Sequence, residues 1–274
     1  MPKERIPLMI FVNKGIETGT QALTLEIIAE TCGTEVAKTA TFLSGPSFAK
    51  EIPVIKRQPT TVSVSSLSLS HAQQTSDLFH QPWFRCYTGA DPVGVELAGA
   101  LKNVYAIATG IADGLGYENN TRAGLITRAL AEMTRIGAAY GASPLTFLSL
   151  AGEFNSPGVG DLMLTCTSSK SRNYTVGFRL GKGEELGYII QTLGSVAEGV
   201  ATSEGLKPMT QRLGVYAPIA DGVYSILYEG RDAKDIAVQL MNEPPLREMD
   251  LPEGAGVPVE ELKRKLGVQS LDPA

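Results

Sequence analysis

The sequence predicts an α/β sheet region over residues 1–90 followed by an all-helical region over residues 91–242. Two observations support this division. Short apolar runs rich in β-branched residues alternate with helix-like segments before residue 90. From Asp91 onward this alternation is lost, and longer segments with helical spacing of apolar residues replace it. Residues 243–274 are rich in proline, glycine and charge, so we expect a loose tail with one helix at Val259–Leu266.

The sheet region is expected to contain four strands separated by helices. Each strand is an apolar or β-branched run that ends at polar or turn-forming residues. The expected strands are Pro7–Asn13, Thr39–Leu43, Thr60–Val64 and Phe84–Tyr87. The expected helices between them are Ala22–Ala29, a short helix Phe48–Glu51 capped by Ser47, and Ser70–Phe79.

The helical region is expected to open with two long helices, which shorter ones follow. The first long helix, Pro92–Ala112, is mostly apolar, and the second is Thr121–Tyr140. The shorter helices are expected at Leu145–Leu150, Ser171–Leu180, Ser195–Leu213, Pro218–Tyr228 and Ala233–Met241.

Composition limits the classes of function. Hydrophobic residues make up 43% of the 274 residues and charged residues 19%, which is enough apolar material for a core. The net charge of −5 argues against general binding to nucleic acid. No apolar stretch has the length of a membrane span. The three cysteines lie far apart, so we expect no disulfide framework, no metal site and a reducing, cytoplasmic compartment.

Lys102 is the first candidate for a catalytic role. Lys102 and Asn103 interrupt the otherwise apolar segment Val95–Ala108 (VELAGALKNVYAIA). A buried, unpaired lysine is unfavourable, so Lys102 either reaches water or works in a cleft with a lowered pKa. Gly99 lies one turn earlier, and its presence inside a helix indicates that something packs closely against that face.

Two segments of the sheet region are candidates for ligand contact. Lys14 directly follows the first strand, where open α/β sheets bind ligands, although a solvated lysine in a turn is the alternative. Gly45 permits close approach of the backbone, and a helix beginning at Ser47 would offer free N–H groups to an anion. An ordinary strand-to-helix turn is the alternative for this second segment.

Two segments of the helical region complete the candidate set. Asp161 follows a glycine-rich stretch and would need a partner if buried, for which Lys102 is a candidate; an Asp that caps a turn is the alternative. Ser171 is expected to cap a helix that has Arg172 in its first turn. An arginine there opposes the helix dipole unless an anion binds at the same place, and a surface arginine is the alternative.

Six segments in this order resemble NAD(P)-dependent glycerol-3-phosphate dehydrogenases, most closely those of the bacterial type. The similarity extends from about Phe11 to about Ala233. The segments are Val12–Ile16 (VNKGI), Ser44–Glu51 (SGPSFAKE), Glu96–Ala108 (ELAGALKNVYAIA), Asn120–Met133 (NTRAGLITRALAEM), Gly160–Cys166 (GDLMLTC) and Ser171–Asn173 (SRN).

The resemblance implies a reaction and a fold. The family interconverts glycerol 3-phosphate and dihydroxyacetone phosphate and passes a hydride to or from NAD or NADP. It has an N-terminal Rossmann domain, of which this chain would hold part, and an all-helical C-terminal domain like that of 6-phosphogluconate dehydrogenase. The resemblance also implies a homodimer in the cytoplasm, although an organelle such as a plastid or glycosome is an alternative.

The resemblance assigns roles to thirteen residues. Lys102 would be the general acid/base, and the same cleft would be lined by Lys14, Asn103, Asp161 and Thr165. Substrate or its phosphate would contact Gly45, Ser47, Ser171, Arg172 and Asn173, together with Lys14, Lys102 and Asp161. The nucleotide would contact Ala49, Val196 and Glu198, together with Lys14 and Arg172.

Two departures from the family pattern carry expectations of their own. No Gly-x-Gly-x-x-Gly turn follows a strand near the N-terminus, so we expect residues 1–274 alone to bind nicotinamide nucleotide poorly and to show little or no dehydrogenase activity. Glu153–Gly158 (EFNSPG) separates Ala151-Gly152 from Val159-Gly160-Asp161, and we expect an inserted surface loop. A non-catalytic binding or dimerisation protein and a related hydroxyacid dehydrogenase remain as alternative functions.

Overall fold

A computed structural model of the chain describes residues 6–52, 57–148 and 158–242. By its internal contacts the chain divides into two compact units, Met1–Leu240 and Met241–Ala274, and the first unit is described below. The predicted helix Val259–Leu266 lies outside the described residues, as does all of the predicted loop Glu153–Gly158 except Gly158. The predicted domain boundary at residue 90 stays a prediction.

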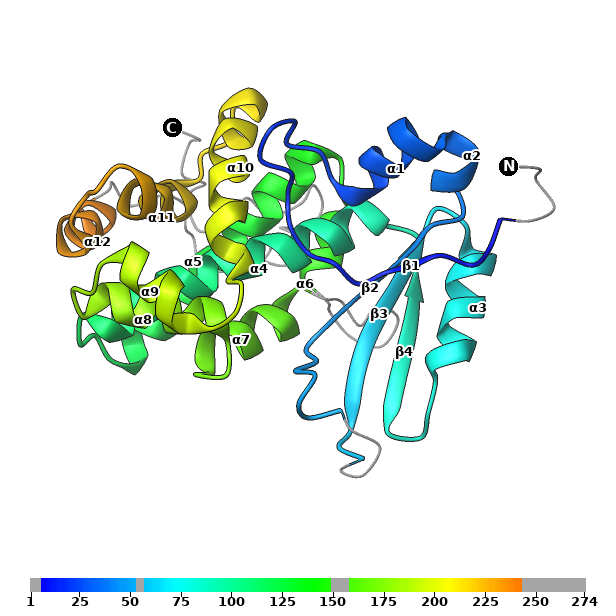
Figure 1. Ribbon diagram of the computed structural model, residues 1–274, viewed down its shortest axis with the longest axis horizontal. Helices are drawn as coiled ribbons and strands as arrows, with labels where there is room; N and C mark the ends of the chain where they lie inside the picture. Colours follow the sequence, from blue (N-terminus) through cyan, green and yellow to red (C-terminus); the bar gives the residue numbers. More distant parts are fainter. Residues whose placement is uncertain (1–5, 53–56, 149–157, 243–274) are drawn as a thin grey trace, which may run out of the picture. The chain divides into compact units, whose positions relative to one another are not determined.

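A four-stranded mixed sheet forms in the first part of the chain, with the strand order β1-β2-β3-β4 (Figure 1). Its strands are β1 (Ile10–Phe11), β2 (Thr41–Ser44), β3 (Thr60–Ser66) and β4 (Phe84–Gly89). β1 runs parallel to β2 and β3 runs parallel to β4, whereas β2 and β3 are antiparallel. Parallel neighbours need a crossover connection, and the described parts of the segment between β2 and β3 contain no helix to provide one.

Helices cover both faces of this sheet. Val62, Val64 and Cys86 pack with Ala72 of α3 (Leu69–Phe79). On the opposite face, Phe42 packs with residues of α1 (Thr24–Cys32), α2 (Thr34–Ala37) and the start of α4 (Pro92–Gly114). The sheet therefore rests directly against the long helix that carries Lys102.

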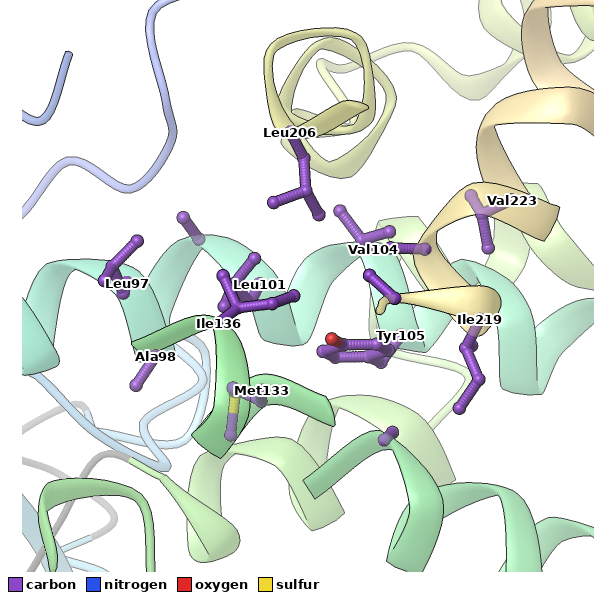
Figure 2. Packing of buried hydrophobic residues seen from close by; sticks show 14 of the residues in the cluster. Leu97, Ala98, Leu101, Val104, Tyr105, Met133, Ile136, Leu206, Ile219 and Val223 are labelled. Atoms are coloured by element: carbon purple, nitrogen blue, oxygen red, sulfur yellow. The ribbon is translucent and has the colours of Figure 1, made fainter. Parts of the chain in front are cut away.

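The helix α4 is the central element of the helical region. It begins where predicted, since the Asp91 side chain accepts a hydrogen bond from Gly94 N at 2.9 Å and Pro92 occupies the first turn. Burial extends along nearly its whole length, to 20 of its 23 residues. Leu97, Leu101 and Tyr105 are fully buried in the main core, to which the other helices contribute (Figure 2). Around it lie α5 (Asn119–Tyr140), α7 (Val159–Thr167), α8 (Arg172–Gly181), α10 (Glu198–Leu213) and α11 (Pro218–Tyr228).

Glycines allow α4 and α8 to pack backbone to backbone. A Cβ atom on Gly177 would lie 2.0 Å from Ile107 O, and one on Gly110 would lie 2.2 Å from Tyr174 O. Four residues further along each helix, Cβ atoms on Gly181 and Gly114 would lie 2.4 Å from Ile111 O and 2.3 Å from Phe178 O. Small residues spaced four apart let two helices approach this closely. The position of the α8 N-terminus relative to Lys102 is set by these contacts.

A buried carboxylate from α5 caps the N-terminus of α11. Glu132 accepts hydrogen bonds from the backbone N–H groups of Ile219 at 3.0 Å and Ala220 at 2.9 Å, and from the Tyr105 hydroxyl at 3.3 Å. Burial raises the pKa of Glu132 to about 7, against the lowering effect of these donors. The residue preceding α11, Ala217, supplies no side-chain cap of its own.

Most of the predicted elements are confirmed, and one predicted helix and three observed helices differ. The helix predicted at Phe48–Glu51 is wrong: only Glu51 N bonds back to Phe48 O, and the Ser47 hydroxyl donates to Gly45 O at 3.1 Å instead of capping a helix. The helices without a predicted counterpart are α2, α7 and α9 (Leu186–Leu193). The short α6 (Pro144–Leu148), α11 and α12 (Ala233–Met241) match their predicted segments. Among the described residues, no helix has both the length and the hydrophobicity to cross a membrane.

Candidate active site

Lys102 and Asp161 form a buried ion pair at the centre of the candidate site. Lys102 lies on α4 and is 6% exposed, while Asp161 lies on α7 and is 1% exposed. The Nζ of Lys102 donates to Oδ1 of Asp161, so the expected pairing is present. Lys14 Nζ lies 3.2 Å from the other carboxylate oxygen, Oδ2. One carboxylate therefore joins two lysines that are 88 residues apart in sequence.

The surroundings of Lys102 shift its proton affinity. Burial lowers the pKa of Lys102 to about 7; Asp161 opposes this shift and Lys14 adds to it. The direction agrees with the second of the two alternatives expected from the sequence, a lysine in a cleft with a lowered pKa. Near neutral pH the side chain can therefore exist as amine or as ammonium, which suits a group that must accept and donate protons.

The sheet brings Lys14 and Ser44 to the same place. Because β1 and β2 are parallel, their carboxyl ends meet at one edge of the sheet. Lys14 comes shortly after β1, and Ser44 is the last residue of β2. Both lie against Gly99 of α4, where a Cβ atom would stand 3.3 Å from Lys14 Cγ and 3.1 Å from Ser44 Oγ. The glycine that the sequence singled out is thus a point of close packing beside the ion pair.

Thr165 and Asn103 lie around the ion pair. The Thr165 hydroxyl donates to the Asp161 backbone carbonyl at 2.6 Å and lies 3.4 Å from Asp161 Oδ1. The Asn103 amide donates to Gly99 O and to Glu198 Oε2, both at 3.3 Å. Glu198 is the first residue of α10, so Asn103 links α4 to that helix.

The N-terminus of α8 offers donors to an anion. Ser171 caps the helix by accepting a hydrogen bond from Tyr174 N at 3.2 Å. Asn173 is buried and accepts from Gly199 N at 2.9 Å, which joins α8 to α10. Arg172, by contrast, is exposed, and its side chain forms no hydrogen bond or ion pair with any described residue. A free guanidinium beside the unpaired N–H groups of a helix N-terminus is a set of donors suited to phosphate.

Comparison with known proteins shows to which family this chain belongs. A family model described as NAD-dependent glycerol-3-phosphate dehydrogenase C-terminus matches residues 91–238, and the model of the N-terminus of the same family matches residues 3–72. The chain belongs to the NAD-dependent glycerol-3-phosphate dehydrogenase family.

Sequence and structure similarity to individual family members supports this assignment. The glycerol-3-phosphate dehydrogenase [NAD(P)+] of Geobacillus kaustophilus is 45% identical over 88% of this chain and 68% of its own length. That of Leptospira biflexa is 46% identical over 89% of this chain and 71% of its own length. The crystal structure of the glycerol-3-phosphate dehydrogenase of Coxiella burnetii superimposes with a TM-score of 0.76 at 34% identity, over 85% of this chain and 68% of the other. The chain thus spans about two thirds of these glycerol-3-phosphate dehydrogenases.

Besides Arg172, four of the thirteen residues named from the glycerol-3-phosphate dehydrogenase resemblance lie outside the hydrogen-bonded cluster. Ala49 is exposed in the turn after β2, and Val196 is 71% exposed just before α10. Gly45 and Ser47 lie in the same turn as Ala49, and the neighbouring Pro46 approaches α7, where a Cβ atom on Gly160 would lie 3.6 Å from Pro46 Cγ. The catalytic and binding roles of all thirteen residues stay predictions.

Two residues near this glycerol-3-phosphate dehydrogenase site were missed as individual residues by sequence reasoning. Ser44 was noticed only as part of its segment, and Gly199 was not noticed. A Cβ atom on Gly199 would lie 2.6 Å from Asn103 O and 2.9 Å from Asn173 Oδ1, so this glycine lets α10 approach both asparagines. Its position directly after Glu198, in the first turn of a helix, was the available signal. Within the described residues, no cluster of His, Cys, Asp or Glu could hold a metal ion.

Proposed function

We propose that the protein interconverts glycerol 3-phosphate and dihydroxyacetone phosphate, with NAD or NADP as the hydride carrier. The observation that supports this most directly is the buried Lys102, whose pKa is lowered to about 7 and whose Nζ is held by Asp161 beside Lys14. A lysine in this state is a suitable acid and base for a secondary alcohol and its ketone. The family membership of the chain supports the same reaction.

Lys102 would move the proton that accompanies hydride transfer. In oxidation, its neutral amine accepts the proton of the substrate's secondary hydroxyl. In reduction, its ammonium donates a hydrogen bond and then a proton to the carbonyl oxygen. Asp161 stabilises the ammonium that forms during oxidation, and Thr165 helps to fix the orientation of that carboxylate. Asn103, held by Glu198, offers an amide next to the same point.

The substrate phosphate would bind at the N-terminus of α8. Arg172 supplies a guanidinium that is not engaged by other described residues, and Ser171 and Asn173 fix the first turn of the helix. Lys14 adds a second positive charge on the side of the ion pair. An anion site near Lys102 would then favour a three-carbon phosphate over free glycerol, which has no phosphate to bind there.

The residues at the starts of α8 and α10 would suit the nicotinamide end of the cofactor. The exposed Val196 supplies apolar surface, and the adjacent Glu198 and the exposed Arg172 supply polar groups at the starts of α10 and α8. Lys14 and Ala49 would contact the cofactor from the sheet side. When bound, the nicotinamide ring accepts or supplies the hydride. Residues 1–274 contain no Gly-x-Gly-x-x-Gly turn to hold the pyrophosphate of the cofactor, so we expect them to bind the nucleotide weakly.

The test is an assay of purified residues 1–274 with dihydroxyacetone phosphate and NADH or NADPH at millimolar concentration. Turnover by residues 1–274 is expected to be low, and Lys102→Ala should lower it further, by about 10²- to 10⁴-fold. Gly124→Ala is the matched control, because a Cβ atom on this glycine of α5 would meet nothing within 4 Å. Turnover that is equal in wild type and Lys102→Ala would contradict the proposal.

We also propose a cytoplasmic homodimer. All three cysteines, Cys32, Cys86 and Cys166, are free thiols, which suits a reducing compartment. Tyr188 and Ile190 of α9 are exposed apolar side chains and supply part of a candidate dimer surface. Light scattering during size-exclusion chromatography tests this directly, and a mass equal to one chain of 29.1 kDa would contradict the dimer.

A further inference from the structure

Lys14 packs closely against α4 at one position. A Cβ atom built on Gly99 would lie 3.3 Å from Lys14 Cγ and 3.5 Å from Lys14 Cδ, so the aliphatic part of the lysine side chain crosses the helix at this glycine. The same Cβ atom would lie 3.1 Å from Ser44 Oγ. Gly99, Ser44 and the Lys14 side chain therefore meet at one buried point, one turn before Lys102.

Both Gly99 and Ser44 are unfavourable choices for stability alone. A glycine in the middle of a buried helix loses stability relative to alanine. Ser44 is 4% exposed, and its hydroxyl has no hydrogen-bond partner among the described residues, which is also unfavourable. Two unfavourable residues that meet at the point where the Lys14 side chain passes indicate that the place of that side chain matters more than the local stability.

The chain beyond Lys14 is anchored independently. Ile16 is buried in the main core of the helical region, and a Cβ atom on Gly205 of α10 would lie 3.3 Å from Ile16 Cγ2 and 3.2 Å from Glu17 O. The backbone near Lys14 is thus fixed against α10, and the side chain has to pass Gly99 to reach Asp161.

We infer that Gly99 and Ser44 are positioning residues: the bare Cα of Gly99 leaves room for the Lys14 side chain to reach Asp161, and Ser44 packs against the same point of α4. This inference rests on the proposed function, because it concerns the charge that Lys14 places beside the proton-transferring Lys102. The charged and titratable groups that face Lys102 from other described elements are Asp161, Lys14 and Cys166.

The distances predict how Gly99→Ala would affect Lys14 and Lys102. Carbon atoms in contact stand about 3.5–4.0 Å apart, so a methyl group on Gly99 pushes the Lys14 side chain away by roughly half an ångström. A misplacement of 1 Å at a reacting centre can cost about 10²-fold in rate, so we expect Gly99→Ala to lower kcat/KM about tenfold. Moving the Lys14 ammonium away also weakens its lowering effect on the pKa of Lys102, so that pKa rises.

The first readout is the titration of Lys102, which needs no enzymatic turnover. It is followed by NMR of the lysine side-chain signals, with the Lys102 signal assigned by its loss in Lys102→Arg. We expect Gly99→Ala to move the Lys102 titration to higher pH and Gly124→Ala to leave it unchanged. In a Lys14→Met background, which keeps a side chain of similar length without its charge, Gly99→Ala should no longer move the titration.

Activity supplies the second readout. We expect Ser44→Ala, which removes the hydroxyl 3.1 Å from the new methyl group, to restore part of the kcat/KM lost in Gly99→Ala. The positioning role is overturned if Gly99→Ala titrates like the Gly124→Ala control, or if the shift is the same with Met at position 14. If all variants and the wild type lack dehydrogenase activity while the titration shifts as expected, the proposed reaction fails and the positioning role stands.

Discussion

Replacing Gly177 with alanine tests the close packing of α4 and α8. The Cβ atom of the alanine would lie 2.0 Å from Ile107 O, 2.8 Å from Ile107 C and 2.9 Å from Ile107 Cα. All three are backbone atoms of a buried helix, so no side-chain rotation relieves the contact. A carbon–oxygen contact needs roughly 3.3 Å, so the two helices have to separate by more than about 1 Å at this point.

The expected loss of stability follows from this geometry. Overpacking of a core typically costs about 1–3 kcal/mol, and a backbone-to-backbone overlap belongs at the upper end of that range or above it. The better helix propensity of alanine returns about 1 kcal/mol at most. We therefore expect a net loss of about 2–3 kcal/mol, which lowers the melting temperature by roughly 4–12 °C for a chain of this size.

Thermal unfolding followed by circular dichroism measures this change. Gly124→Ala on α5 is the control: it has the same change in helix propensity with no atom within 4 Å of the new methyl group, and we expect a slightly higher melting temperature. The activity assay adds a second measurement, since a shift of α8 moves Arg172 relative to Lys102 and should lower kcat/KM by about 10²-fold. A Gly177→Ala protein that melts at the wild-type temperature would refute the packing argument.

Three further predictions concern single side chains. Lys102→Ala should retain the wild-type circular dichroism spectrum while turnover falls about 10²- to 10⁴-fold; near-normal kcat would exclude Lys102 as the acid and base. Arg172→Lys should weaken binding of glycerol 3-phosphate more than that of glycerol, because a planar guanidinium grips phosphate oxygens with two bonds; equal losses in calorimetry would exclude a phosphate role. The third concerns Glu132, whose pKa is raised from 4.5 to about 7, so the folded state holds its proton more tightly and the free energy of unfolding should fall as pH rises through this range. Glu132→Gln should remove part of that fall in urea titrations at several pH values, and an unchanged pH dependence would count against the assignment.

The sequence predicts those helices whose ends carry a local signal. Proline in the first turn and a capping aspartate mark the start of α4, and proline again marks the start of α11. The helix α7 carries no such signal, since Gly158 and Gly160 suggest a turn, and it forms because its apolar side packs on α4. The antiparallel pairing of β2 with β3 was not predicted, because strands that alternate with helices favour parallel pairing and the helix expected between them at Phe48–Glu51 does not form.

Only part of the candidate site could be predicted from the sequence. Lys102 and Asp161 could be predicted as partners, because a buried charge in an apolar segment requires an opposite charge. For the glycine contacts between α4 and α8, the sequence shows only that Gly177 and Gly181 are four residues apart, as Gly110 and Gly114 are. Which helices meet through those glycines depends on tertiary packing, and a single sequence does not reveal it.

The burial of α4 on all sides determines how the molecule opens. Neighbouring elements surround 20 of its 23 residues, so its amide groups meet solvent only after several of those elements have separated together. Hydrogen–deuterium exchange should therefore be slowest in α4 and approach the rate of global unfolding, while α12, with one buried residue, and the two-residue β1 exchange early. The backbone beneath Lys102 then belongs to the last part of the molecule to lose its structure, and partial unfolding at the periphery leaves the proton-transferring group in place.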